Sequence, residues 1–170
     1  MRKVVVAAVL GALVVAPAAG STRSTTFRIG RVVDGDTVVL ASGARVRLVQ
    51  IDTPEVYGEV QCYGPRASAT TKRLLPPGTA VFLAAEPATD AVDRYGRLLR
   101  YVVRARDGLD VNVYLVRVGA AAPYFYDHRL GRYANLLQRL ALRARRLRLG
   151  LWGRCPHTRY DPYRRLQSRR

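Results

Sequence analysis

The sequence predicts an α+β protein in which a small set of β-strands precedes most of the helices. Segments up to about residue 105 are rich in β-branched residues, and glycine, proline and aspartate turns separate them. A longer segment near the C-terminus instead repeats apolar residues at spacings of three and four, as an amphipathic helix does. With 170 residues, the chain has the length of a single domain.

The first three strands are expected within residues 27–51. The segments FRIGRVV, TVVLAS and ARVRLVQI are rich in β-branched residues, and the dipeptides Asp34-Gly35 and Ser42-Gly43 separate them. The second break is short enough for a tight hairpin between the second and third strands.

A helix and two further strands follow. Residues 64–75 predict a helix, because Pro65 suits its first turn and the sequence Pro76-Pro77-Gly78 stops it. Three more segments come next, at 80–85, 97–105 and 110–119. The first two have the composition of strands, and the third fits either a short helix that ends at Gly119 or a strand.

The last long element is a helix with two distinct faces. Its apolar face consists of Tyr133, Leu137, Leu140, Ala144 and Leu147. A second face carries Arg139, Arg143 and Arg146. This basic face is either a surface that follows nucleic-acid phosphates or an ordinary solvated face. Residues 156–170 show no periodicity and predict a basic, mobile tail.

This order of elements suits a small, partly closed barrel. Three strands, a helix, two strands and then helices match the five-stranded OB-fold β-barrel with about three α-helices. We therefore expect one OB-fold domain over residues 27–155.

The chain is strongly basic. Its 29 lysines and arginines outnumber its 12 acidic residues, which gives a formal net charge of +17. Such a surplus favours a polyanionic partner, either nucleic acid or an anionic membrane. The alternative is a soluble protein from an arginine-rich proteome.

The first twenty residues have the layout of a secretory signal peptide. Arg2 and Lys3 precede an apolar run from Val4 to Ala16, and small residues follow it. The run is short for a membrane span, which needs about 20 residues. We expect a secreted, extracytoplasmic protein, or a membrane-anchored one if the segment stays uncleaved.

The two cysteines, Cys62 and Cys155, fit an exported chain. An even number of cysteines in an oxidising compartment favours a disulfide. Two independent buried thiols are an alternative, and a zinc site that adds His128 and His157 is a third.

Acidic residues gather in one short segment of this basic chain. They are Asp34, Asp36, Asp52, Glu55 and Glu59. If Ser42 and Gly43 form the hairpin turn, Asp36 lies across from about Val49 and near Asp52. Close carboxylates repel one another unless a cation lies between them, and oxygen donors suit Ca²⁺ or Mg²⁺. The alternative is two ordinary turns, at Asp34-Gly35 and after Asp52.

Five motifs together resemble the staphylococcal nuclease (thermonuclease) family. They are VVDGDTVVL, VRLVQIDTPE, CYGPRAS, DRYGR and GLW, in the order and approximate spacing of that family. The resemblance covers roughly residues 27–155, most of the chain.

The resemblance implies a calcium site and a catalytic carboxylate. The carboxylates of Asp36 and Asp52 and the backbone carbonyl of Thr53 correspond to the Ca²⁺ ligands. Glu55 corresponds to the residue that acts as general base or positions the attacking water.

The resemblance also implies which residues contact the substrate. Arg47 and Arg97 correspond to the arginines that hold the reacting phosphate. The nucleotide-binding positions correspond to Arg94, Tyr95, Tyr124 and Tyr126. Because five residues span about 17 Å in an ideal strand, the chain must bend between Arg47 and Asp52 for both to serve one phosphate.

The implied function is a Ca²⁺-dependent nuclease, working as a monomer with no protein partner. It would cleave DNA and RNA with little sequence specificity, prefer single-stranded or unpaired regions, and leave 3′-phosphate ends. Two rivals remain, a nucleic-acid-binding module without activity and a basic membrane-surface protein anchored by residues 4–19.

Overall fold

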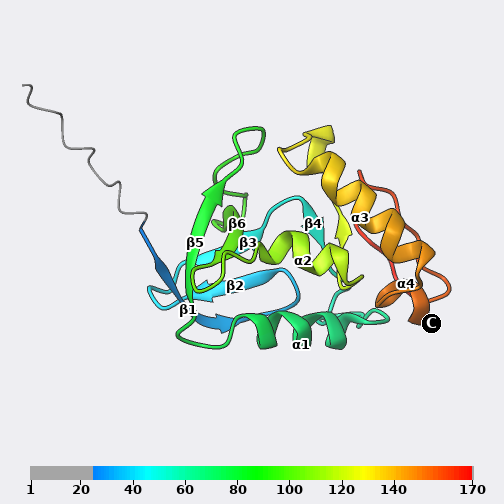
Figure 1. Cartoon of the computed structure of the whole chain (residues 1–170), viewed down its shortest axis with the longest axis horizontal. Coiled ribbons are helices and arrows are strands. Elements are labelled where there is room, and N and C mark those ends of the chain that lie inside the picture. The colour runs from blue at the N-terminus through cyan, green and yellow to red at the C-terminus, as the bar shows by residue number, and fades with distance from the viewer. Residues whose placement is uncertain (1–24, 170) are drawn as a thin grey trace, which may run out of the picture.

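The structure, a computed structural model, describes residues 25–169 and contains a closed five-stranded barrel (Figure 1). Its strands in chain order are β1 (Phe27–Val32), β2 (Thr37–Leu40), β3 (Arg45–Leu48), β5 (Ala80–Ala85) and β6 (Leu98–Arg104). Around the barrel they follow the order β1-β2-β3-β6-β5, with β3 and β6 parallel. The predicted α+β class and OB-fold barrel are confirmed.

Helices cover the barrel, and a short pair of strands extends it. The helices are α1 (Gly64–Leu74), α2 (Val111–Arg117), α3 (Ala134–Arg146) and α4 (Leu151–Arg154), with a 3₁₀ turn at Tyr126–His128. The short strands β4 (Ile51–Asp52) and β7 (Ala122–Pro123) pair antiparallel. In Figure 1, α3 and α4 lie on the side away from β1 and β5.

The segment that fitted either a helix or a strand forms helix α2. The Asp110 side chain accepts a hydrogen bond from the Val113 amide at 3.0 Å and so caps the first turn. Asn112 then joins the helix to the barrel, because its side chain donates to the Val49 carbonyl at 2.8 Å and accepts from the Val102 amide at 3.0 Å.

One continuous apolar core fills the barrel and extends under α2 and α3. The strands contribute fully buried residues such as Val38, Val46 and Leu48, while Leu115 and Leu137 enter from the two helices. Removing any one of these large side chains would leave a cavity at a cost of about 2–5 kcal/mol. This rigid packing holds the end of β3, where the predicted site begins.

The predicted bend between Arg47 and Asp52 is confirmed. Strand β3 ends at Leu48, and Gln50 adopts a left-handed backbone with φ 64° before β4 begins. The Gln50 side chain holds this bend by donating to the Arg129 carbonyl at 2.8 Å and accepting from the Gly131 amide at 2.9 Å.

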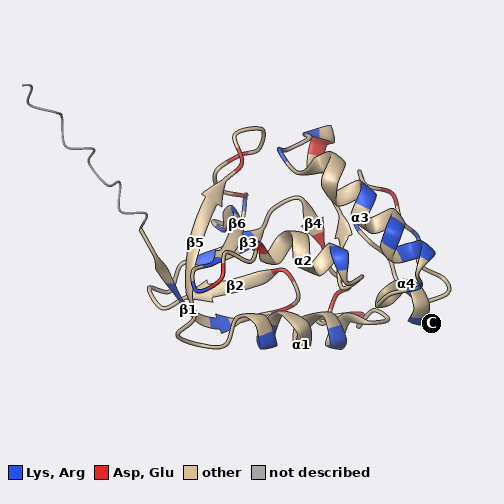
Figure 2. Ribbon diagram, in the orientation of Figure 1, with Lys and Arg blue, Asp and Glu red and all other residues tan. Residues whose placement is uncertain are grey.

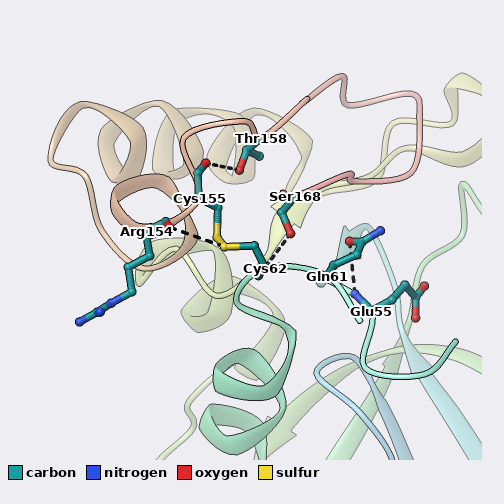
Figure 3. The surroundings of a disulfide bond; sticks show 7 residues. All are labelled: Glu55, Gln61, Cys62, Arg154, Cys155, Thr158 and Ser168. Carbon is teal, nitrogen blue, oxygen red and sulfur yellow. Dashed lines mark hydrogen bonds between the residues drawn. A yellow bond between two sulfur atoms is a disulfide. The ribbon is translucent and has the colours of Figure 1, made fainter. Parts of the chain in front are cut away.

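The two cysteines form a disulfide, as predicted (Figure 3). Cys62 lies just before α1 and Cys155 just after α4, so the bond joins segments 93 residues apart in sequence. This pairing replaces the alternatives of two free thiols and a zinc site.

The segment after the disulfide has defined contacts that the sequence pattern did not predict. Residues 156–169 fold back against the domain, with Arg159 bridged to Gln167 and with Leu166 and Ser168 buried. Single buried side chains of this kind create no periodicity in the sequence, so the pattern resembles that of an unpacked tail.

The expected signal peptide lies outside the described residues. Within residues 25–169, none of the helices has the length and apolar character that crossing a bilayer requires.

Candidate active site

The β2–β3 hairpin places Asp36 opposite the end of β3. Thr37 pairs with Arg47, and the Asp36 carbonyl accepts the Leu48 amide at 2.8 Å. Asp36 therefore lies across from Leu48, one residue from the expected Val49. The difference arises at the turn, where Gly43, with φ 88°, closes a three-residue loop in place of a two-residue one.

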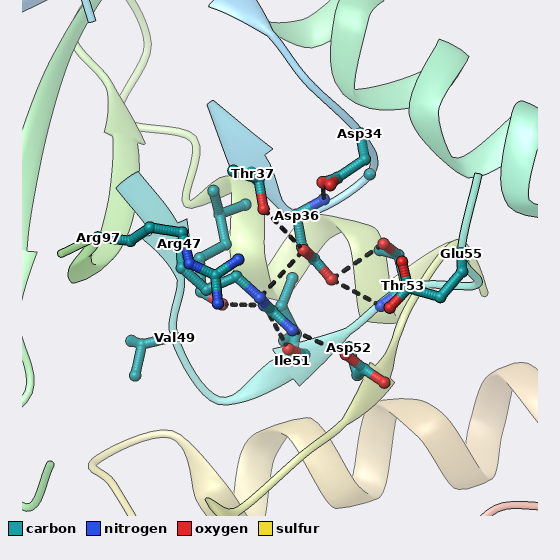
Figure 4. A network of polar contacts seen from close by, with 12 residues as sticks. Asp34, Asp36, Thr37, Arg47, Val49, Ile51, Asp52, Thr53, Glu55 and Arg97 are labelled. Atoms are coloured by element: carbon teal, nitrogen blue, oxygen red, sulfur yellow. Dashed lines mark hydrogen bonds and ion pairs between the residues drawn. The ribbon is translucent and has the colours of Figure 1, made fainter. Parts of the chain in front are cut away.

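The buried guanidinium of Arg47 joins the carboxylates of Asp36 and Asp52 (Figure 4). Its Nε lies 3.1 Å from Asp36 Oδ1, and one terminal nitrogen lies 2.7 Å from Asp52 Oδ1. The other terminal nitrogen donates to the carbonyls of Leu48 and Ile51 at 2.7 and 2.8 Å. Arg47 thus fixes the bend and the two acids at the same time.

Thr53 holds the second oxygen of Asp36. Its backbone N–H and its hydroxyl donate to Asp36 Oδ2 at 2.8 and 2.9 Å. This contact needs a glycine at position 35, because a Cβ there would lie 2.5 Å from the Thr53 hydroxyl oxygen. The DGDT and DTPE motifs are therefore one structural unit, with Thr53 placed beside both predicted ligand carboxylates.

The cluster contains more buried negative charge than Arg47 compensates. Burial, together with the neighbouring Asp36 carboxylate, raises the pKa of Asp34 to about 6. Burial also raises the pKa of Asp52 to about 6, with Arg47 opposing the shift and Asp36 adding to it. Burial would lower the pKa of the Arg47 guanidinium, but Asp36 and Asp52 outweigh it and raise that pKa.

This donor set fits a hard cation. Asp36 and Asp52 contact one guanidinium, so their carboxylates lie close enough together to share an ion, and their excess charge favours one. Among residues 25–169, no group of three or more acidic, histidine or cysteine side chains is arranged as a full ligand cage. Backbone oxygen and water must then complete the coordination, as is common for Ca²⁺ and Mg²⁺.

Glu55 lies at the solvent edge of the cluster. Its backbone N–H donates to the Gln61 side chain at 3.3 Å (Figure 3). Its side chain is 41% exposed. One carboxylate oxygen lies 3.0 Å from a terminal nitrogen of Arg165. Glu55 is therefore open to solvent water, while Arg165 connects it to the buried Asp52.

A groove of about 270 Å³ opens beside Arg47. Its walls include all four predicted nucleotide-binding residues and both predicted phosphate-binding arginines: Arg47, Arg94, Tyr95, Arg97, Tyr124 and Tyr126. The structure therefore brings these residues to one surface, although they come from separate parts of the chain.

Asp93 holds Arg97 in this groove. The Asp93 carboxylate accepts from Arg97 Nε and from a terminal nitrogen, both at 2.7 Å, as well as from the Arg97 backbone N–H at 3.0 Å. The guanidiniums of Arg94 and Arg97 lie 5.0 and 5.3 Å from the centre of the Tyr95 ring. The DRYGR motif is thus a turn that presents two cations and an aromatic ring.

Exposed aromatic rings border the groove. Tyr95 is 60% exposed and Tyr126 is 67% exposed, while Tyr124 and Tyr126 meet edge to face at 6.4 Å. Rings with one free face can stack on the bases of an unpaired strand.

Three contributors to the site were not predicted from the sequence. They are Asp93, Arg165 and the backbone N–H of Leu166. Asp93 belongs to the DRYGR motif and could have been found as the carboxylate partner of Arg97. Arg165 and Leu166 lie in a segment without periodicity, where no sequence signal indicates them.

The fold and the site define an OB-fold protein whose barrel holds buried carboxylates beside an arginine- and tyrosine-lined groove. Residues 45–154 match the family described as "Staphylococcal nuclease homologue". The chain is 33% identical over 138 residues to the "Thermonuclease" of Staphylococcus intermedius, covering 78% of this chain and 79% of that protein. The "Thermonuclease" of Staphylococcus hyicus is 32% identical over 75% of each chain. The chain belongs to the staphylococcal nuclease family.

The match also extends to a larger protein. "Endonuclease YhcR" of Bacillus subtilis is 38% identical over 109 residues, which are 57% of this chain and 9% of that protein. The matched region is therefore a unit that also occurs within a much longer chain.

Proposed function

We propose that this protein is a Ca²⁺-dependent nuclease that hydrolyses the phosphodiester bonds of DNA and RNA with little sequence specificity. Its family membership makes it a nuclease of the hydrolase class. The main support for this proposal is the position of Arg47. It contacts both Asp36 and Asp52 and also lines the aromatic groove. One guanidinium thus links the acidic cluster to the surface where a nucleic-acid strand would lie.

Fixed positive charge is the main requirement of this reaction. Attack on phosphorus builds negative charge on the phosphate oxygens, and preorganised arginines stabilise that charge without reorganising. Arg47 and Arg97 suit this role, because carboxylates hold each planar guanidinium in place. The buried Arg47 would act mainly through its charge, since its nitrogens already contact protein oxygens. A Ca²⁺ ion held by Asp36, Asp52 and the Thr53 carbonyl would add further stabilisation of the same charge.

Glu55 is the proposed partner of the attacking water. It is the exposed carboxylate of the cluster, so it can accept a proton or orient a water molecule at the edge of the groove. The leaving group in this proposal is the 5′-oxygen, which leaves 3′-phosphate ends.

The groove favours unpaired strands. Tyr95, Tyr124 and Tyr126 offer base-stacking faces that every base can use, which accounts for low sequence specificity. Arginines also lie along the outer side of α3 (Figure 2), where Arg139, Arg143 and Arg146 are exposed. Binding to this much positive charge should weaken steeply as salt increases.

We further propose an extracytoplasmic, monomeric enzyme. The signal-like first twenty residues support export, and an oxidised Cys62–Cys155 pair is typical of an exported protein. An uncleaved segment would instead anchor the same enzyme to a membrane.

The test is cleavage of single-stranded DNA by residues 21–170, with Ca²⁺ or with EGTA, beside Glu55→Gln. We expect calcium-dependent cleavage that the substitution reduces about 10²–10⁴-fold. Binding of DNA without cleavage, unchanged by EGTA, would contradict the proposal and leave a binding module. Association of the full chain, residues 1–170, with lipid vesicles but not with DNA would instead support the membrane-surface alternative.

A further inference from the structure

The C-terminal segment, residues 163–168, lies directly against the acidic cluster. The backbone N–H of Leu166 donates to Asp52 Oδ2 at 2.9 Å. The Leu166 side chain is 3% exposed and packs in a small apolar cluster with Ala122, Leu151 and Cys155. A predicted metal ligand is therefore oriented by a residue more than a hundred positions away in sequence.

The segment is attached on both sides of this contact. After it, the Ser168 hydroxyl donates to the Cys62 carbonyl at 2.6 Å, and the Cys62 N–H donates to the Ser168 carbonyl at 3.1 Å (Figure 3). Before it, the Pro162 carbonyl accepts the Phe125 N–H at 2.7 Å, and the Tyr163 ring stacks on His128 at 4.3 Å. These contacts fix the position of Arg165, which lies between them.

Arg165 lies at the mouth of the groove. One of its terminal nitrogens is 3.0 Å from Glu55 Oε1 and 3.6 Å from Asp52 Oδ1. Its guanidinium lies 6.0 Å from the centre of the Tyr124 ring, and the residue lines the same groove as Arg47.

The two arginines differ in the donors that they leave free. In Arg47, all three guanidinium nitrogens contact carboxylates or carbonyls, and the residue is 6% exposed. In Arg165, the contacts to other described residues involve only one terminal nitrogen, and the side chain is 52% exposed. A guanidinium has five N–H donors, so Arg165 retains donors for an incoming phosphate.

We propose that the C-terminal segment contributes directly to the active site, an inference that rests on the proposed nuclease function. Arg165 is a third arginine that binds a substrate phosphate beside Glu55, and the Leu166 N–H is a positioning group for Asp52. The disulfide and the Ser168–Cys62 hydrogen bonds hold this segment in place.

Arg164 provides a matched control. It is adjacent in sequence and carries the same charge, but its side chain is 85% exposed and pairs with Asp161 at 3.6 Å. Replacing Arg164 removes one positive charge from the same segment without removing a contact to the acidic cluster.

The experiment compares Arg165→Ala, Arg165→Lys and Arg164→Ala in the oxidised protein. Binding of a fluorescein-labelled single-stranded oligonucleotide is measured by anisotropy in EDTA, and kcat and KM are measured separately with Ca²⁺. We expect Arg165→Ala to weaken oligonucleotide binding about 10-fold, with Arg164→Ala within about twofold of the parent protein. Arg165→Lys should restore part of the loss, because it keeps the charge but not the planar fork.

Two results would overturn the role of Arg165. Equal oligonucleotide affinity of Arg165→Ala and Arg164→Ala would show that Arg165 contributes only general surface charge. Tighter binding or faster cleavage by Arg165→Ala would show that it obstructs the groove. Because binding is measured without metal or turnover, the comparison decides this question even if the parent protein cleaves nothing, which would count against the proposed function alone.

A chain ending at Pro162 tests the Leu166 amide. It lacks both Arg165 and the Leu166 N–H, so its Ca²⁺ affinity, measured by calorimetry, should fall about 10-fold below that of Arg165→Ala. Ca²⁺ affinity equal to that of Arg165→Ala, in a chain with a cooperative thermal transition, would contradict the positioning role of Leu166.

Discussion

The acidic cluster of the candidate site and the donor cluster around the single carboxylate of Glu86 have opposite electrostatics. In the candidate site, Asp34, Asp36 and Asp52 share the charge of Arg47, and burial raises the pKa of Asp34 and of Asp52 to about 6. Near the far end of β5, the single carboxylate of Glu86 is also buried, yet its pKa is lowered. The neighbours explain the contrast: Asp36 raises the pKa of both Asp34 and Asp52, whereas the neighbours of Glu86 are hydrogen-bond donors and a positive charge, which lower its pKa.

Glu86 is surrounded by hydrogen-bond donors. Burial alone would raise its pKa, but the backbone N–H groups of Arg132 and Ala88 donate to it at 2.8 and 3.1 Å and lower it. The Tyr101 hydroxyl adds a hydrogen bond at 3.1 Å, and Arg132 contributes its charge. Gly131 must lack a side chain here, because a Cβ would lie 2.6 Å from Glu86 Oε2.

The difference is the one expected between a structural carboxylate and the proposed functional ones. A carboxylate whose charge the protein satisfies holds the fold together, as Glu86 joins β5 to the start of α3. Carboxylates whose charge the protein leaves partly uncompensated are prepared for a ligand of opposite charge. Each cluster therefore predicts a different response when its charge is changed.

The largest expected effect comes from removing Arg47, the arginine of the candidate site. Arg47→Ala leaves the buried Asp36 and Asp52 with only the half-exposed Arg165 nearby as a counter-charge, so the free energy of unfolding should fall by about 3–5 kcal/mol. Cleavage should also fall at least about 100-fold. The matched change, Arg132→Ala, removes a side chain that is 44% exposed and should cost about 1 kcal/mol or less, with activity unchanged.

Urea denaturation and single-stranded DNA cleavage measure both effects. Equal stability losses in the two variants would contradict the view that Arg47 is the main counter-charge of the acidic cluster.

The next effect comes from the disulfide, which supports only one of the clusters. Replacing Cys62 and Cys155 by serine opens a loop of 93 residues, and the free energy of unfolding should fall by about 2–5 kcal/mol. Hydrogen exchange should then show faster exchange of the Leu166 amide, which donates to Asp52. The Arg132 amide, which donates to Glu86, should be affected only through the global loss of stability. A similar local change at both amides would argue against a segment-specific role of the disulfide.

Much of the fold and part of the site could be predicted because their signals are local. The strands follow from β-branched segments and turn residues, and the bend before Asp52 follows from the length of chain between it and Arg47. The acidic cluster was visible because DGDT and DTPE flank one hairpin. The turn at Gly43 shifted the register by one residue, since its loop length depends on a left-handed backbone.

The remaining features depend on contacts between distant residues. The pairing of β4 with β7 and the contact of Leu166 with Asp52 join segments far apart in sequence. Neither produces a periodic pattern, because each involves only one or two residues. The Asp93–Arg97 pair lies between these cases, since its residues lie four positions apart in one motif but their contact depends on the turn geometry.

A moderate effect should follow from neutralising the structural carboxylate. The Glu86 carboxylate accepts hydrogen bonds from several N–H and O–H groups, and the amide of Glu86→Gln is a weaker acceptor. The free energy of unfolding should therefore fall by about 1–3 kcal/mol at pH 7. Because the pKa of Glu86 is lowered, its contribution is present above its ordinary value of 4.5 and is lost as pH falls through the lower folded value. Below about pH 4.5 the parent protein should therefore approach the variant in stability.

Urea titrations at pH 7 and at acidic pH test this prediction, with DNA cleavage as the control for an intact site. A stability difference between the two proteins that stays constant across this range would mean that the charge of Glu86 contributes nothing.

The smallest effect has the opposite sign. Asp34→Asn should leave the protein equally stable or about 1 kcal/mol more stable in EDTA at pH 7.5, because it removes a charge that burial and Asp36 disfavour. Asparagine can keep the turn, since its side-chain oxygen can accept the Asp36 N–H as the aspartate does at 3.0 Å. Thermal unfolding measures the change, and Glu86→Gln under the same conditions is the matched comparison. Destabilisation by both substitutions would mean that the candidate site is as fully compensated as the structural cluster, and the distinction between the two would fail.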